Sequence, residues 1–343
     1  MKFSNILKYF LFLTIGVGIL YLMWTKNSSA YEEECILRGA NLDNCNLFDK
    51  IITDFSQANW IWIVVVLIIF MLSNIFRALR WNQLLATLGY SPSTINSLGT
   101  LMLGYFANLG IPRIGEIIRA TSMSRYENIP VEQTMATIIV GRIIDVLFLL
   151  LFIGASFVLS FNVLSKYFQD NFQFSIINLV YLGISLAIAS IIGYFVFIRF
   201  SKGFALSNNK LLNKLSEIMN RFLEGLKSIL KVDNKALFIA YSLGIWVCYY
   251  LMTYLCFFAY EPTSHLGPIA GLVVFVFGTL GIVFPSPGGM GSYHYLVVQA
   301  LIIYGIGGVE AFSFAMLLFF AIQLFCNILF GIIALVGLPI FNK

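Results

Sequence analysis

Charged side chains are scarce in this chain. Asp, Glu, Lys and Arg make up only 11% of its 343 residues, whereas about 25% is usual for a soluble globular protein. Hydrophobic residues make up 59%, and the mean hydropathy is +0.88. A membrane-spanning helix needs about 20 apolar residues, and continuous runs of that length recur along the chain. The shortage of charge argues against a soluble domain, and the absence of alternation favours helices over a β-barrel.

Histidine and cysteine are also rare, with two and five residues, and they show no zinc-ligand spacing. No metal and no cofactor are therefore expected. Cys248, Cys256 and Cys326 lie in apolar runs, where a buried thiol is usually a small core residue. Cys35 and Cys45 share a polar loop that we place outside the cytoplasm, where a disulfide is permitted but not required. The net charge of +5 is small and scattered, so nucleic acid is not an expected partner.

Long apolar runs define the expected fold. Two stretches, Ile95–Met123 and Gly267–Tyr304, are interrupted by Pro and Gly, whereas six runs are continuous. The first continuous run also resembles a signal peptide, because Ser28-Ser29-Ala30 follows it like a cleavage site, although its length favours a retained helix. We expect an all-α polytopic membrane protein with six full spans plus two broken or re-entrant helical hairpins, in a single domain over residues 1–343. The six expected spans are Ile6–Trp24, Trp60–Leu79, Glu132–Ser160, Ser175–Ile198, Ala236–Ala259 and Ala311–Ile340.

Loop charge orients these spans, because Lys and Arg are retained on the cytoplasmic side. Loop 26–58 carries six acidic and three basic residues, so we place it outside. Arg77 and Arg80 close the next span and mark its cytoplasmic end. Segment 199–235 has eight basic and three acidic residues and is also placed in the cytoplasm. Both termini are then cytoplasmic, and we expect a multi-pass protein of the plasma (inner) membrane.

The two interrupted stretches organise the chain into halves. Stretch 95–123 has to return to the side that it left, which predicts a re-entrant hairpin entering from the cytoplasm. Stretch 267–304 is either a hairpin from the outer side or two short spans. In the hairpin case, residues 60–160 and 236–340 form an inverted repeat, an architecture typical of transporters. Segment 199–235 links the two halves. Its residues 210–231 have an apolar face flanked by Lys and Arg, which predicts an amphipathic helix on the inner leaflet.

The first hairpin carries charges at membrane depth. Pro112 suits the first position of a new helix, and Arg113, Glu116 and Arg119 follow at intervals of three residues, close to one face. Charges in a membrane normally pair or face a polar cavity. Two arginines and one glutamate leave one positive charge, a helix N-terminus adds to it, and the planar guanidinium suits phosphate. The alternative is that the arginines only reach toward lipid headgroups.

The second hairpin has a glycine-rich turn. Pro287 stands where a new half-helix would begin, and Gly288, Gly289 and Gly291 would allow backbone N–H groups to approach a ligand. His294 lies about two turns into that helix, where it either acts as a proton-linked switch or only bonds to a neighbour. Two half-helices aimed from opposite sides would bring their positive ends to one place.

A further charged pair lies in the expected span Glu132–Ser160. Arg142 and Asp145 are three residues apart, so they can form a buried ion pair that fixes helix packing. The alternative is that Arg142 extends the cationic site of the first hairpin.

Four motifs in order resemble the lysylphosphatidylglycerol synthase transmembrane (flippase-like) family, roughly from Trp81 to the end. They are Gly104-Tyr105-Phe106-Ala107-Asn108, Pro112-Arg113-Ile114-Gly115-Glu116-Ile117-Ile118-Arg119, Gly141-Arg142-Ile143-Ile144-Asp145 and Pro285-Ser286-Pro287-Gly288-Gly289-Met290-Gly291. The resemblance implies a membrane region linked to lipid translocation. Full synthases add a soluble aminoacyl-transferase domain; the chain ends at Lys343 without one, so synthase chemistry is not expected. Gly141 and His294 depart from the family, where many relatives have acidic residues.

Three functions remain open from the sequence. The first is a flippase or transporter for an anionic phospholipid or a polyprenyl-phosphate-linked lipid, in which Arg113, Arg119 and Arg142 hold phosphate while Glu116 and His294 balance charge or protons. The second is a membrane-embedded transferase acting on a lipid carrier, although paired carboxylates, a nucleotide-binding glycine loop and a nucleophile–base pair are all missing. The third is a non-catalytic membrane partner of a lipid-modifying enzyme or glycosyltransferase. The oligomeric state is not predicted.

Overall fold

The computed structural model describes residues 3–39, 45–111, 114–172, 231–283 and 287–342, and these contain helices and no strand. The expected span Ser175–Ile198 lies outside the described residues, as does nearly all of segment 210–231. Pro112, Arg113 and the Pro285-Ser286 pair also lie outside them.

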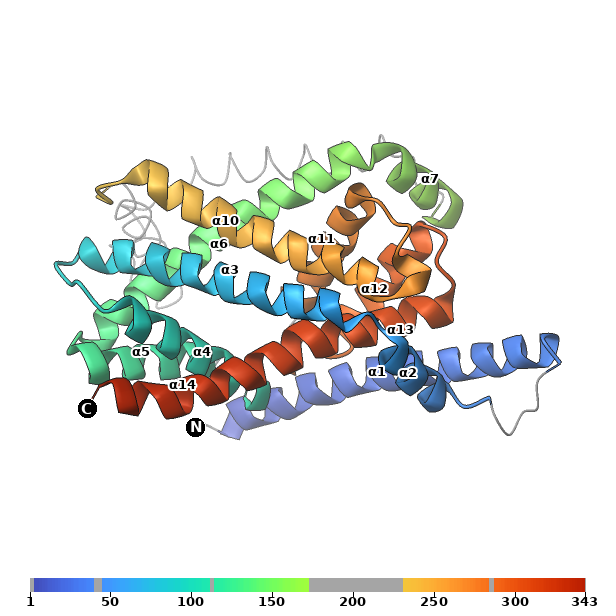
Figure 1. The fold of residues 1–343 in the computed structure, drawn as a ribbon, viewed down its shortest axis with the longest axis horizontal. Coiled ribbons are helices and arrows are strands. Elements are labelled where there is room, and N and C mark those ends of the chain that lie inside the picture. Colours follow the sequence, from blue (N-terminus) through green and yellow to red (C-terminus); the bar gives the residue numbers. More distant parts are fainter. Residues whose placement is uncertain (1–2, 40–44, 112–113, 173–230, 284–286, 343) are drawn as a thin grey trace, which may run out of the picture.

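Four helical segments of the described chain are long and apolar enough to cross a membrane. They lie at Trp60–Ala86 (α3), Val131–Leu159 (α6), Lys235–Ala259 (α10 with a 3₁₀ turn) and Gly308–Phe341 (α13 to α14). These segments run along the long axis of the molecule (Figure 1). Each matches one of the expected spans within a few residues, except that α3 continues from the expected end at Leu79 to Ala86. Arg77 and Arg80 are therefore inside the helix and not at its end.

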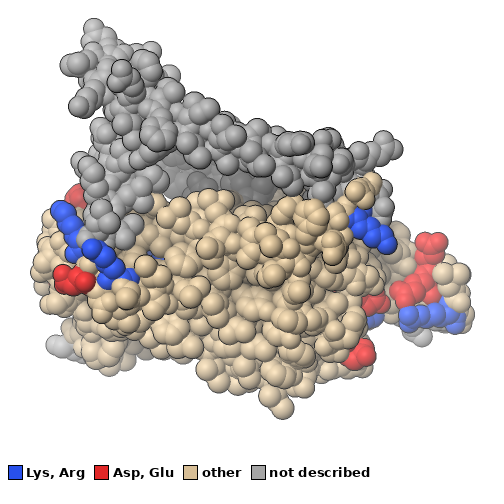
Figure 2. Space-filling view, turned by 90° about the horizontal axis from the view of Figure 1, so that it is seen from above, with Lys and Arg blue, Asp and Glu red and all other residues tan. Residues whose placement is uncertain are grey.

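The surface carries its charge at the two ends of this axis. On the face shown in Figure 2, acidic and basic side chains gather at the ends, and the wide middle has none. Large apolar side chains such as Ile61, Ile68, Leu150 and Val158 are exposed on α3 and α6. An uncharged belt with exposed apolar side chains is what the hydrocarbon core of a bilayer requires.

The N-terminal helix α1 (Phe3–Leu37) contains the expected first span and continues through Ser28-Ser29-Ala30 without interruption. It packs against α12 and α13, where Trp24 makes an edge contact with Phe312 at 6.2 Å and Asn27 is buried. This packing favours a retained helix over a cleaved signal peptide. Beyond α1, Cys35 and Cys45 form a disulfide with a Cα–Cα distance of 6.2 Å. The short amphipathic helix α2 (Leu47–Gln57) follows.

The first hairpin consists of α4 (Thr94–Gly110) and α5 (Ile114–Glu127), which pack against each other. At their base, the Glu127 carboxylate accepts hydrogen bonds from the Ser93 N–H at 2.9 Å and from Asn96 Nδ2 at 2.6 Å. The chain therefore leaves the hairpin beside the point where it began, as a re-entrant hairpin requires. Asn342, next to the C-terminus, also bonds to Asn96, so the C-terminus lies at the same end of the molecule.

Close backbone packing joins the two arms of this hairpin. A Cβ on Gly115 would lie 2.0 Å from the Gly104 carbonyl oxygen, and one on Gly104 would lie 2.8 Å from the Gly115 carbonyl oxygen. Only residues without a side chain allow this approach. The pair of glycines sets the distance between α4 and α5, and thereby the position of every side chain on α5.

The second hairpin consists of α11 (Pro268–Val283) and α12 (Ser292–Ile303), joined through the 3₁₀ turn η4 (Pro287–Gly289). At 1.5 Å per residue, these helices are about 24 Å and about 18 Å long, less than the roughly 30 Å hydrocarbon thickness. They pack side by side, which favours the hairpin over two short spans. Positive φ angles of 60°, 79° and 82° at Gly288, Gly289 and Gly291 explain why the turn is rich in glycine.

Two features connect or extend these elements. The amphipathic helix α7 (Phe161–Phe172) follows α6 and lies next to α12. Between α13 (Gly308–Phe319) and α14 (Asn327–Phe341), the chain forms a π-helix at Phe320–Cys326. The expected span Ala311–Ile340 is thus one continuous helical rod with a local change of pitch.

Candidate functional site

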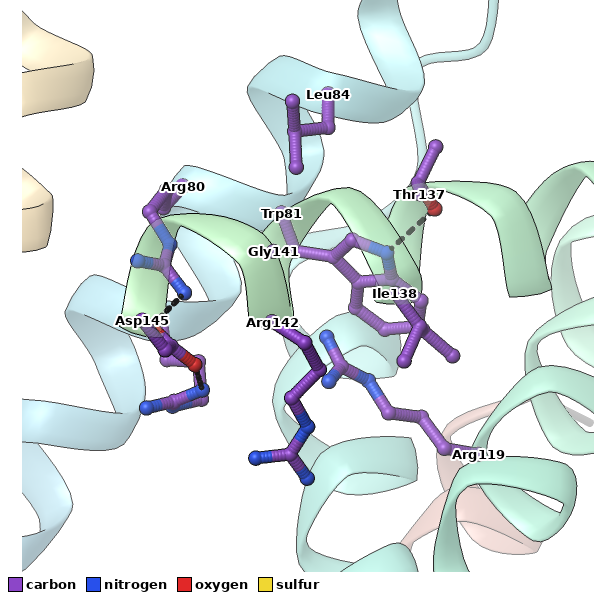
Figure 3. A pocket seen from close by; sticks show the side chains of 10 residues that line it. Arg80, Trp81, Leu84, Arg119, Thr137, Ile138, Gly141, Arg142 and Asp145 are labelled. Carbon is purple, nitrogen blue, oxygen red and sulfur yellow. Dashed lines mark hydrogen bonds and ion pairs between the residues drawn. The ribbon is translucent and has the colours of Figure 1, made fainter. Parts of the chain in front are cut away.

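A cationic pocket lies among α3, α5 and α6 (Figure 3). Its enclosed space is small, about 10 Å³, which is about what one water molecule needs. Four of its lining side chains are arginines. The lining residues are Arg77, Arg80, Trp81, Leu84, Arg119, Thr137, Ile138, Gly141, Arg142 and Asp145.

The pocket lies beside α3 and α6, two of the helices long and apolar enough to cross a membrane. Arg80 and Arg77 precede the end of α3 at Ala86 by about 9 Å and about 13 Å of helix, at 1.5 Å per residue. Arg77, Arg80 and Arg142 lie on helices long and apolar enough to cross a membrane, where a charge persists only if it is paired or functional.

Asp145 holds the inner side of the pocket together. Its carboxylate accepts from Arg77 Nη1 at 2.7 Å and from Arg80 Nη2 at 2.8 Å, and all three side chains are buried. Arg77 also donates to the Tyr249 hydroxyl of α10 at 2.9 Å. This network ties α3 to α6 and α10, and its hydrogen bonds satisfy a carboxylate that would otherwise be costly to bury.

The expected ion pair between Arg142 and Asp145 does not form, so that interpretation of the two residues is wrong. Although they lie three residues apart on α6, Asp145 faces the arginines of α3, and Arg142 faces α5. Arg142 Nε donates to Glu116 Oε1 at 2.9 Å. These two side chains are 50% and 33% exposed, so this second bridge lies at the open side of the pocket.

Arg119 has a different environment from the other three arginines. Its guanidinium carbon lies 3.6 Å from the centre of the Trp81 ring, and the Trp81 indole N–H donates to Thr137 Oγ1 at 2.9 Å. Figure 3 shows Arg119 reaching from α5 to this ring with Arg142 beside it. No described carboxylate lies within ion-pair distance of Arg119, and its buried Nε has no described hydrogen-bond partner.

The pocket therefore has an excess of positive charge. Its four arginines face two carboxylates, those of Asp145 and Glu116. Arg119 is repelled by Arg77, Arg142 and Arg80, and its stacking on Trp81 offsets part of this cost, because a guanidinium is attracted to an aromatic face. Such an arrangement is suited to an anion with several oxygen atoms, and guanidinium groups bind phosphate with paired hydrogen bonds.

Of the residues predicted for the first motif, Glu116 and Arg119 meet Arg142 at this pocket, and Arg113 lies outside the described residues. The predicted contribution of the helix N-terminus is reduced, because the Gly115 N–H already donates to Asn108 Oδ1 at 2.8 Å. The positive charge of the site comes from side chains further along α5 and not from its first turn.

The residues predicted for the second motif do not line this pocket. The helix α4 contacts η4, so the two hairpins meet there, but Pro287, Gly288 and Gly289 do not line the cationic pocket. A Cβ on Gly291 would lie 2.2 Å from the Gly16 carbonyl oxygen of α1, which explains this glycine by helix packing. His294 is 1% exposed and packs on Phe319, with ring centroids 4.6 Å apart.

Sequence reasoning missed Arg77, Arg80, Trp81 and Thr137 as site residues. Arg77 and Arg80 were interpreted only as markers of a helix end. Their signal was nevertheless present, because Arg77, Arg80 and Trp81 lie at i, i+3 and i+4 and hence on one face of an apolar helix. Thr137 carries no such signal, since a single threonine in a helix is common.

Comparison with known proteins adds two findings. The family model of the lysylphosphatidylglycerol synthase TM region matches residues 47–331, a range that contains the whole pocket. The UPF0104 membrane protein MJ1595 of Methanocaldococcus jannaschii is 30% identical over 118 residues, which cover 33% of this chain and 35% of that protein. The match thus spans about a third of that relative's length. No solved structure gives a significant match.

Proposed function

The chain belongs to the lysylphosphatidylglycerol synthase transmembrane-region family, and from that premise we propose that it is a flippase-type lipid transporter. In this proposal, the phosphate of an anionic phospholipid or of a polyprenyl-phosphate-type lipid binds in the pocket of α3, α5 and α6. The observation that carries the proposal is the excess of two positive charges in a pocket lined by two candidate membrane-spanning helices, with Arg119 lacking a described acidic partner.

The surroundings of the pocket favour a lipid over a free anion. Ile117 of α5 and Ile139 of α6 are both more than half exposed. Ile117 directly follows Glu116, and Ile139 lies about one turn before Arg142. An opening flanked by exposed apolar side chains faces hydrocarbon in a membrane. A lipid could place its phosphate on the arginines while its chains remain in the bilayer. Because the enclosed space holds about one water, the exposed Arg142 side would have to move to admit a phosphate.

The packing of the helices supports the inverted repeat as part of this function. Residues 60–160 supply α3, the hairpin α4–α5 and α6; residues 236–340 supply α10, the hairpin α11–α12 and α13–α14. The first helices of the two halves, α3 and α10, pack on each other. The first arm of each hairpin packs on the last helix of the other half, α4 on α14 and α11 on α6. Such an exchange is expected of two halves related by a two-fold axis in the membrane plane.

The proposed orientation places the base of the first hairpin and both termini in the cytoplasm of a plasma membrane. The headgroup would then reach the arginines from the cytoplasmic side. This orientation also places the basic segment 199–235 in the cytoplasm, the side on which Lys and Arg are retained.

The test is lipid binding and transport by matched arginine variants. Arg119→Ala removes the cation in the pocket, and Arg125→Ala removes an exposed cation from the end of the same helix. Native mass spectrometry of the detergent-purified proteins should show an anionic lipid retained by wild type and by Arg125→Ala but lost from Arg119→Ala. In reconstituted vesicles, translocation of fluorescent phosphatidylglycerol should fall at least tenfold in Arg119→Ala alone. Equal binding and transport in all three proteins would refute the proposal.

A further inference from the structure

The two carboxylates of the pocket differ in how firmly they are held. Asp145 is buried and accepts from two buried arginines. Glu116 forms an ion pair with Arg142, and both side chains of that pair are substantially exposed. Exposed ion pairs contribute little to stability, because solvent screens them and two long side chains lose freedom. Glu116 can therefore leave Arg142 at small cost, whereas Asp145 cannot leave its partners.

The Glu116–Arg142 bridge also lies where a ligand would have to enter. It joins α5 to α6 at the open side of the pocket, and Arg119 lies one turn after Glu116 on the same helix. The guanidinium of Arg142 is close enough to Arg119 to repel it. An oxyanion that reached Arg119 would thus also be within the field of Arg142, whose Nε is occupied by a carboxylate oxygen.

We propose that Glu116 is an internal competitor for the anion site, and that an incoming phosphate group replaces its carboxylate on Arg142. The same phosphate contacts Arg119, which Trp81 holds in place from the other side. When the phosphate leaves, Glu116 returns to Arg142 and the bridge between α5 and α6 is restored. This inference rests on the proposed function and assigns Glu116 a role opposite to that of a binding residue: it weakens binding so that the ligand can be released.

A carboxylate suits this role for a chemical reason. Carboxylate and phosphate both accept hydrogen bonds from the edge of a guanidinium, so they compete for Arg142 directly. The amide of glutamine has the same shape but no charge, so a hydrogen bond that its oxygen accepts from Arg142 is weaker and is more easily replaced by a phosphate. Glu116→Gln should therefore tighten binding of a phosphate group, although it removes a residue of the site.

The experiment is a titration of the purified full chain with dioleoylphosphatidylglycerol, followed by native mass spectrometry. Glu116→Gln should lower the dissociation constant about fivefold, which is about 1 kcal/mol. The matched control is Glu34→Gln, which removes the same charge and also breaks an exposed ion pair, with Arg38, but at the far end of α1. It should bind like wild type. A second titration with inorganic phosphate distinguishes the ligand source, because tightening for the lipid alone assigns the site to a lipid headgroup, and tightening for both assigns it to the phosphate group itself.

A double variant separates competition from a general change of charge. In an Arg142→Gln background, Glu116→Gln should no longer tighten binding, because no cation is left to release. Persistent tightening in that background, or equal dissociation constants for wild type and Glu116→Gln, would overturn the inference while leaving the proposed function intact. Failure of Glu116→Gln to fold would also overturn it, since a bridge that opens for a ligand cannot be needed for folding. If wild type binds neither probe, the proposed function itself falls.

Discussion

Replacing Asp145 by Asn should destabilise the protein far more than replacing Glu116 by Gln, although each change converts a carboxylate to an amide of the same shape. Asp145 accepts from Arg77 and Arg80 at 2.7 Å and 2.8 Å, and these arginine side chains are 7% and 3% exposed. Without Asp145, two buried guanidinium groups lose the only counterion that the described residues supply, and removing one partner of a buried pair costs about 3–5 kcal/mol. Loss of the exposed Glu116–Arg142 bridge costs about 0–1 kcal/mol.

Thermal unfolding of the detergent-solubilised proteins, followed by size-exclusion chromatography of the heated samples, measures this difference. Asp145→Asn should melt several degrees below wild type, and Glu116→Gln should melt close to it. Adding Arg80→Gln to Asp145→Asn should recover part of the loss, because one of the two unpaired charges is removed. If Asp145→Asn melted as high as Glu116→Gln, the division into a structural and a displaceable carboxylate would be refuted.

Three further substitutions test the scaffold around the site. Gly115→Ala should destabilise the first hairpin by about 1–3 kcal/mol, since its Cβ would overlap a backbone oxygen of α4 at 2.0 Å, whereas a Cβ on Gly154 of α6 would meet no described atom within 4 Å, and Gly154→Ala should melt like wild type. Thr137→Val leaves the Trp81 indole N–H without its 2.9 Å acceptor, so it should lower stability by about 1–3 kcal/mol and weaken phosphatidylglycerol binding in the same titration. Cys35→Ser opens a loop that is closed by a disulfide in the structure, and it should lower the melting temperature in a non-reducing buffer while leaving lipid binding unchanged; an equal fall for wild type in reductant would confirm that the disulfide is the cause.

The helical architecture was predictable because its strongest signal is local. A run of about 20 apolar residues specifies a spanning helix without reference to the rest of the chain, and four such segments are described where they were expected. The hairpins were predictable from the positions of Pro112 and Pro287 together with the side to which the chain had to return. Helix ends were less accurate: α3 passes Leu79 and continues to Ala86. Within it, Arg80 pairs with Asp145, a partner on another helix that no local pattern reveals.

The candidate site was predicted only in part, for a related reason. Periodicity places residues on one face of one helix, so Glu116 and Arg119 were correctly grouped on α5. Choosing among partners on different helices requires the packing. Arg142 and Asp145 looked like a pair by spacing, but the buried arginines of α3 hold the carboxylate and Glu116 bonds to Arg142. The glycine-rich turn of the second hairpin was interpreted as a place where backbone N–H groups approach a ligand. In the structure, Gly291 instead allows the close approach of α1.

The distribution of charge between the two hairpins constrains how a transporter of this architecture would work. The pocket draws its residues from α3, α5 and α6, and none comes from α11, η4 or α12. If the halves are related by an inverted repeat, the described part of the second half has no matching cluster of arginines, and its His294 is buried against Phe319. A headgroup would thus be bound from the side of the first hairpin, and its release toward the other side would depend on weakening that one site. Glu116, as a carboxylate that returns to Arg142, supplies a means of weakening it without a second cationic site.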